Sequence, residues 1–159
     1  MSTTRRMRLC AIILLASLTS AIGGEGEFII EASDFDDGNV RVSRSGQTYA
    51  DGASCIWNGG ELPNRADYVV EFPVAADYAL SGLYAAAESR TVEIILDGKQ
   101  VHRGFAGVTG SWNTSSAQWE PQCVLRLSAG THTLLLRREG PMPHICALRL
   151  KSSVPFPAG

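Results

Sequence analysis

Apolar and polar residues alternate along most of this chain, in short runs that end at turn-forming residues. A period of two is typical of β-strands that bury one face against a core. The residues predicted to face the core are Phe28, Ile30 and Ala32; Tyr68, Val70 and Phe72; Tyr78, Leu80, Gly82 and Tyr84; and Cys146, Leu148 and Leu150.

Turn residues separate these runs. The sequence "DGK" lies between "TVEIIL" and "QVHRGF", which predicts a tight hairpin, and "SAG" separates "CVLRL" from "THTLLLRR". Outside the N-terminal residues, no window of about twelve or more residues has apolar side chains at helical spacing. About eight to ten short strands at this spacing predict an all-β, antiparallel sandwich or barrel.

Two polar segments interrupt the strand pattern, residues 37–54 and 107–122. Both segments contain aromatic residues. Long connections at the surface are where binding residues concentrate, because a rigid scaffold can hold them there. We therefore expect the function of the protein to reside in these two segments.

The N-terminus has the order of a secretory signal peptide. Arg5, Arg6 and Arg8 precede an apolar run over residues 9–18, and small residues follow. The run is too short to span a bilayer comfortably, so a membrane anchor is the less favoured alternative. We predict a signal peptide over 1–23, a β-sandwich domain over 24–152 and a C-terminal tail over 153–159, in a protein that is secreted or held in the periplasm or cell envelope.

Charge and cysteine content narrow the class of partner. Removing the three signal-peptide arginines moves the formal charge from −2 to about −5, so neither nucleic acid nor an anionic membrane surface is an expected partner. The remaining cysteines are Cys55, Cys123 and Cys146, and export permits disulfides. Because their number is odd, at least one thiol stays free or joins another chain, and the pairing stays open.

Several segments follow one another in a known order. They are "FIIEASDFDDGNV", "RADYVVEFPVAADYALSGLYAA", "VEIILDGKQV", "TGSWNTSSAQW", "LSAGTHTLLLR" and "PHICALRL". In this order they resemble carbohydrate-binding modules of families six and thirty-five, over residues 27–151. The resemblance implies an antiparallel jelly-roll β-sandwich of the galactose-binding-domain-like type, and similar modules occur in large exported planctomycete proteins.

The resemblance also implies a structural calcium that joins the first and last strands. Glu31 matches the first carboxylate of the family, but Ser33 and Cys146 stand where the family carries further carboxylates. Calcium takes about six to eight oxygen ligands, and a thiol is a poor ligand for so hard a cation. We therefore expect no cofactor and no bound metal, with small side chains filling the position; a structural calcium retained at Glu31 is the less favoured alternative.

Sugars present C–H faces and hydroxyl groups, so a site for them offers aromatic rings together with polar side chains. The candidate ligand-binding residues are Trp112, Asn113, Trp57, Tyr49, Trp119 and His144. Trp112 matches the loop tryptophan of the family, and its glycine- and serine-rich surroundings predict a ring that faces solvent. Trp119 enters a strand, so core packing is the favoured alternative for that residue.

Signatures of an enzyme are missing from the sequence, which has no G-x-S-x-G elbow, no H-E-x-x-H motif and no glycine-rich phosphate loop. Asp34, Asp36 and Asp37 could imitate a pair of catalytic carboxylates, but an acidic run at a strand end is more often solvated or turn-forming. The sequence favours a non-catalytic module that recognises an oligosaccharide or polysaccharide. The alternative is a structural or adaptor domain of the same fold that docks a protein partner in the cell envelope.

Overall fold

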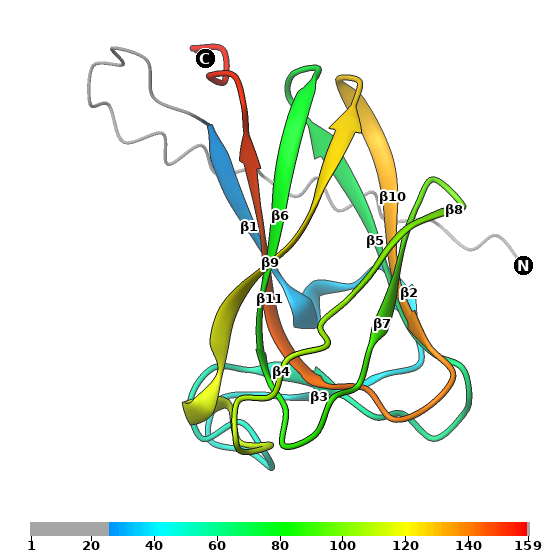
Figure 1. Cartoon of the computed structure of the whole chain (residues 1–159), viewed down its shortest axis with the longest axis vertical. Helices are drawn as coiled ribbons and strands as arrows, with labels where there is room; N and C mark the ends of the chain where they lie inside the picture. Colours follow the sequence, from blue (N-terminus) through cyan, green and yellow to red (C-terminus); the bar gives the residue numbers. More distant parts are fainter. Residues whose placement is uncertain (1–25, 159) are drawn as a thin grey trace, which may run out of the picture.

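The structure is a computed structural model that describes residues 26–158, so the predicted signal peptide lies outside the described residues. Within them the chain forms two antiparallel β-sheets that pack face to face (Figure 1). This arrangement confirms the predicted all-β sandwich. No helix in residues 26–158 is long and apolar enough to cross a membrane.

The first sheet has the strand order β3, β4, β11, β6, β9, and β1 also pairs with β11. The last strand of the chain, β11, therefore pairs with three others: β1, β4 and β6. The strands of this sheet are β1 (Glu27–Glu31), β3 (Arg41–Ser43), β4 (Cys55–Trp57), β6 (Ala76–Ala85), β9 (Gln118–Leu127) and β11 (His144–Ser152).

The second sheet has the strand order β2, β5, β10, β7, β8. The predicted "DGK" hairpin joins β7 to β8, and Asp97 and Gly98 both have positive φ, 49° and 82°, as a tight hairpin turn requires. The "SAG" turn instead carries the chain from the first sheet to the second. The strands are β2 (Asp37–Gly38), β5 (Asn64–Phe72), β7 (Val92–Leu96), β8 (Lys99–Gly104) and β10 (Gly130–Arg138); two single-turn 3-10 helices are η1 (Ala32–Asp34) and η2 (Thr114–Ser116).

The predicted alternation locates the core between the two sheets. The predicted core positions of β1, β5 and β6 are buried or pack against the main core. The prediction is wrong for Cys146, which lies apart from Leu148 and Leu150, in a small cluster with Cys55 and Ala50. The reason is a β-bulge in β11 opposite β6, because an extra residue reverses the alternation of the side chains beyond it.

Phe105 fills the space above Gly82 and thereby fixes where the second polar segment leaves the core. The Phe105 side chain is fully buried, its φ is 56°, and its ring lies 5.2 Å from the ring of Tyr84. A Cβ atom on Gly82 would lie 2.2 Å from Cε1 of Phe105. The sheet therefore needs a residue without a side chain at this position.

We expect Gly82→Ala to destabilise the fold by about 1–3 kcal/mol, because the added methyl group overpacks the core at Phe105. Urea unfolding of the purified variant measures this loss. Gly60→Ala is the matched control, since a Cβ atom at Gly60 meets nothing within 4 Å. A Gly82→Ala protein as stable as the wild type would show that the Phe105 ring does not constrain this part of the core.

Candidate functional site

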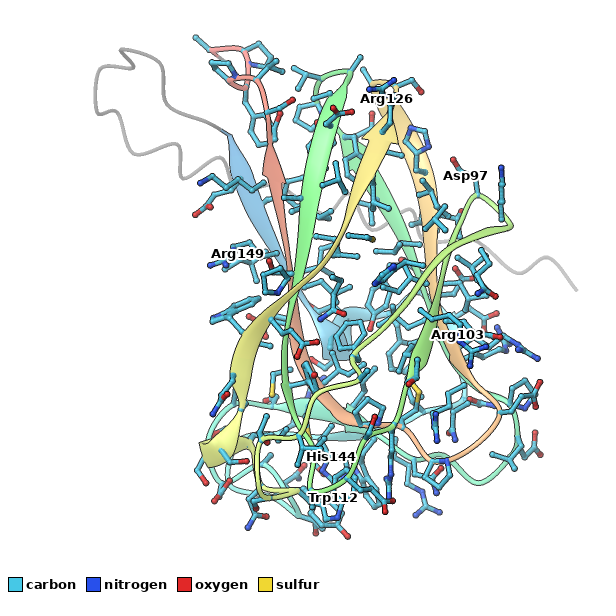
Figure 2. All side chains as sticks on the ribbon, in the orientation of Figure 1. Asp97, Arg103, Trp112, Arg126, His144 and Arg149 are labelled. Carbon is cyan, nitrogen blue, oxygen red and sulfur yellow. The ribbon has the colours of Figure 1, made fainter. Side chains whose placement is uncertain are left out.

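Four of the predicted site residues come together at one end of the sandwich, the lower end in Figure 1. Tyr49 lies in the connection between β3 and β4, Trp57 ends β4, Trp112 precedes η2, and His144 begins β11. Figure 2 shows Trp112 and His144 side by side at this end. We call these four rings the aromatic cluster.

His144 is the centre of the aromatic cluster. The centroid of its ring lies 4.4 Å from that of Tyr49, 5.0 Å from that of Trp112 and 6.4 Å from that of Trp57. The rings of Tyr49 and Trp57 are themselves 5.2 Å apart in an edge-to-face arrangement. Contacts of this kind stabilise beyond the area that they bury, so the four rings support one another.

The protonation of His144 follows from its contacts. Its Nδ1 lies 2.6 Å from the backbone oxygen of Trp112, and because a carbonyl only accepts, Nδ1 carries the hydrogen and donates it. The side chain is 3% exposed. Burial lowers the pKa of His144, and the nearby charge of Arg90 lowers it further. The ring is therefore neutral at neutral pH and acts mainly to hold the other three rings.

Tyr49 presents the most accessible ring of the cluster, with 36% of the residue exposed. Its φ of 65° lies in the left-handed region, which costs a residue with a side chain about 1–3 kcal/mol. Hydrogen bonds hold this conformation: the N–H of Thr114 donates to the Tyr49 carbonyl at 2.8 Å, and the N–H of Ala50 donates to the Gln47 carbonyl at 2.9 Å. The surrounding loop thus imposes an unfavourable backbone on Tyr49, whose ring packs against His144 and Trp57 and stays partly exposed.

Hydrogen bonds join the two polar segments to each other. Thr114 Oγ1 donates to the carbonyl of Ala53 and accepts from the N–H of Gly52. The N–H and the hydroxyl of Ser115 donate to the carboxylate of Asp51 at 2.8 and 2.7 Å, and these bonds lower the pKa of Asp51. Sequence reasoning singled out neither Thr114 nor Ser115, although "NTSS" is rich in side chains that bond to backbone.

Two arginines cover faces of the tryptophans, and sequence reasoning identified neither. The guanidinium carbon of Arg90 lies 3.8 Å from the ring centroid of Trp112, and that of Arg41 lies 5.3 Å from Trp57. Trp112 is half-buried and packs against the main core. The Trp112 ring therefore does not face solvent as we expected. The second polar segment folds back onto the core, and Arg90 covers one face of the ring.

The two other candidates lie outside the aromatic cluster. Asn113 is exposed beside Trp112. Trp119 is 38% exposed on β9, so the core alternative for it is wrong. The guanidinium of Arg149 lies 4.6 Å from its ring centroid, and a pocket of about 140 Å³ adjoins it. Trp119 is thus part of a second surface with an accessible ring, next to the carboxylate of Glu120.

A larger pocket of about 270 Å³ is lined by charged side chains and no aromatic ring. Its lining residues are Thr91, Glu93, Arg103, Arg138, Glu139 and Gly140. Without a ring to stack against the C–H face of a sugar, it is a weaker candidate than either aromatic surface.

The acidic run near β2 has structural bonds. Asp36 accepts from the N–H of Val69 at 2.7 Å, and Asp37 accepts from its neighbour Gly38 and pairs with Arg65. These carboxylates hold β2 beside β5, in agreement with the turn-forming interpretation of the run.

The residues that the sequence resemblance places at a calcium ion do not fit that ion. Ser33 Oγ accepts from Nη1 of Arg44 at 3.0 Å, so a guanidinium already contacts this position. Burial raises the pKa of the Cys146 thiol to about 12, and the charge of Glu31 raises it too. A cation, a protonated thiol and one exposed carboxylate form no set of ligands for calcium.

We expect the thermal midpoint to be the same in excess calcium and in chelator, with magnesium as the control ion. A metal that binds only the folded state at a hundred times its dissociation constant would add about 2.7 kcal/mol of stability. A rise of the midpoint that calcium produces and magnesium does not would contradict this prediction.

We expect two histidines to titrate on opposite sides of 6.5, His144 below it and His132 above it. The hydrogen bond to Asp97 raises the pKa of His132, whereas burial lowers that of His144. The unfolded chain therefore binds the His144 proton first as the pH falls below 6.5, and the folded state loses stability there. Ring resonances followed by NMR test this, and a His144 that titrates at or above 6.5 would disprove its buried neutral state.

No protein-family model matches the sequence, and no curated protein matches it. Solved structures do match. A family 35 carbohydrate-binding module from an environmental isolate aligns with a TM-score of 0.64 and 16% identity, over 83% of this chain and 98% of the module. The C-terminal family 6 module of LamC, a marine laminarinase from Zobellia galactanivorans, aligns with a TM-score of 0.63 and 20% identity, over 80% of this chain and 100% of the module.

A β-(1,4)-mannanase from Podospora anserina that carries a family 35 module also aligns, with a TM-score of 0.67 and 20% identity over 84% of this chain. This chain spans only 29% of that enzyme. Likenesses at such identities concern the fold. The chain has the galactose-binding-like β-sandwich fold of the family 6 and family 35 carbohydrate-binding modules.

Proposed function

We propose that this protein is an exported, non-catalytic module that recognises a glycan at the aromatic cluster. One observation carries the proposal. Segments far apart in the sequence bring the rings of Tyr49, Trp57, Trp112 and His144 together at the loop end of the sandwich, with contacting ring centroids 4.4–6.4 Å apart. Tyr49, with the most exposed ring of the cluster, is the first stacking residue for a sugar face. Trp57 and Trp112, both half-buried with an arginine over one face, offer further aromatic surface, and Asn113 supplies an amide for sugar hydroxyls.

The chemistry of the cluster suits a polysaccharide or oligosaccharide. A pyranose ring exposes a patch of C–H groups that packs on an aromatic face, and its hydroxyls bond to polar side chains at the rim. Strained backbone persists only where its surroundings enforce it, and such strain gathers at functional sites. The left-handed Tyr49 fits this description. Solved modules of this fold support the proposal, among them a family 6 module of Clostridium stercorarium in complex with cellobiose.

A domain that docks a protein partner is the alternative function. Arg41 and Arg90 beside the rings would serve such a partner as well, since arginine and aromatic residues are enriched at protein interfaces. Binding of soluble glycans therefore has to be measured directly.

The test is a glycan screen on the purified protein followed by titration of variants with the best ligand. Tyr49→Ala should weaken binding about tenfold or more, which is about 1.4 kcal/mol, and lower stability by about 1 kcal/mol or less. Tyr49→Phe should bind almost as the wild type does, because it keeps the ring. Trp119→Ala is the matched control, since its ring is as exposed as that of Tyr49, and it should bind normally.

Three outcomes would overturn the proposal. Loss of binding in Trp119→Ala with normal binding in Tyr49→Ala would place the site on the face of the first sheet. A protein that binds no glycan would favour the adaptor function. Reducing ends released during the titration and abolished in Asp36→Asn would mean catalysis.

A further inference from the structure

Cys55 and Cys146 lie on neighbouring antiparallel strands, each one step beyond the pair that Ile56 and Ile145 form. Continued by that step, the register brings Cys55 opposite Cys146, and the shared cluster of their side chains agrees with this placement. Residues that face each other in an antiparallel pair have Cα atoms about 4.5–5.5 Å apart, which lies within the range of about 4.4–6.8 Å that a disulfide spans.

The two cysteines also pack together. Both are buried free thiols in this structure, and with Ala50 they form a cluster that is separate from the main core. Trp57 and Leu83 pack against this cluster. The bulge in β11 is what turns Cys146 to this side of the sheet while Leu148 returns to the core.

Cys123 cannot take the place of either partner. It lies on β9, opposite Leu80 of β6, and packs against the main core. β6 separates β9 from β11, and two strand spacings are about 9–10 Å, too far for a disulfide. Of the three possible pairings among these cysteines, only that of Cys55 with Cys146 remains.

We propose that Cys55 and Cys146 form a cross-strand disulfide that ties β4 to β11. With a glutathione disulfide as oxidant, one cysteine thiolate attacks it and forms a mixed disulfide, which releases one glutathione thiolate. The second cysteine thiolate attacks the protein-bound sulfur and releases the other. The two protons lost by the cysteines end on the two glutathione thiols, which carry away the two electrons.

This bond forms before the cluster closes. Burial raises the pKa of Cys55 to about 11 in the folded protein, so its thiolate is scarce once Ala50 and Trp57 cover it. In the unfolded or partly folded chain both thiols are accessible to the oxidant. The disulfide is therefore a product of oxidative folding.

The cross-link bears on the aromatic cluster. Ala50 of the cysteine cluster follows Tyr49, and Trp57 contacts both the cysteine cluster and the aromatic cluster. β4 has only three residues, so a covalent tie at Cys55 restrains the strand that directly follows the Tyr49 loop. The consequence for ligand binding rests on the proposed glycan recognition, and formation of the bond in the cell rests on the proposed export.

The experiment is oxidative refolding of the full chain followed by peptide mapping. The reduced, unfolded protein is refolded in a mixture of reduced and oxidised glutathione, quenched with acid, alkylated in denaturant and digested without reduction. We expect one linked pair of peptides that contains Cys55 and Cys146, and an alkylated Cys123. Cys123→Ser should give the same link, and Cys146→Ser should give none.

A second readout is the thermal midpoint of oxidised and reduced samples. The oxidised wild type and Cys123→Ser should melt at least about 5 °C higher than their reduced forms, because the link constrains the unfolded chain. Cys146→Ser should show no difference. Alkylation of all three cysteines after refolding, or a link that involves Cys123, would overturn the proposal. Neither readout uses a glycan, so both stand if glycan binding fails.

Discussion

The bulge in β11 is the constraint on which the arrangement of the loop end depends. An unbroken strand would place His144, Cys146, Leu148 and Leu150 on one face. With one extra residue between Ile145 and Ala147, the core receives Ile145, Leu148 and Leu150. His144 and Cys146 instead face the loops, where His144 meets the aromatic rings and Cys146 meets Cys55.

Contacts between distant segments hold the loop end next to this bulge. His144 donates a hydrogen bond to the backbone oxygen of Trp112, and Thr114 of η2 forms hydrogen bonds with the loop that contains Tyr49. Each bond is modest alone, but a buried network whose members are all paired is stiff. The stiffness is what keeps Tyr49 in a backbone conformation that its side chain disfavours.

Ordinary side chains fill the space where β1 and η1 meet the start of β11. Arg44 contacts Ser33, and Cys146 joins an apolar cluster. Backbone pairing joins the first and last strands, from Glu27 opposite Lys151 to Glu31 opposite Ala147.

The sequence by itself determined the sandwich. Strands such as β5 and β6 bury one face, so their apolar and polar residues alternate, and this alternation can be recognised from neighbouring residues alone. It also indicated which segments carry the rings. It did not determine where each ring points. The position of Cys146 depended on a bulge that no local signal announces, and the burial of Trp112 depended on Arg90, which lies far away in the chain. Trp119 was exposed for a similar reason: only the packing of the two sheets decides which face of β9 is inside. Tertiary structure alone decided these features, since each is a contact between residues that the sequence keeps apart.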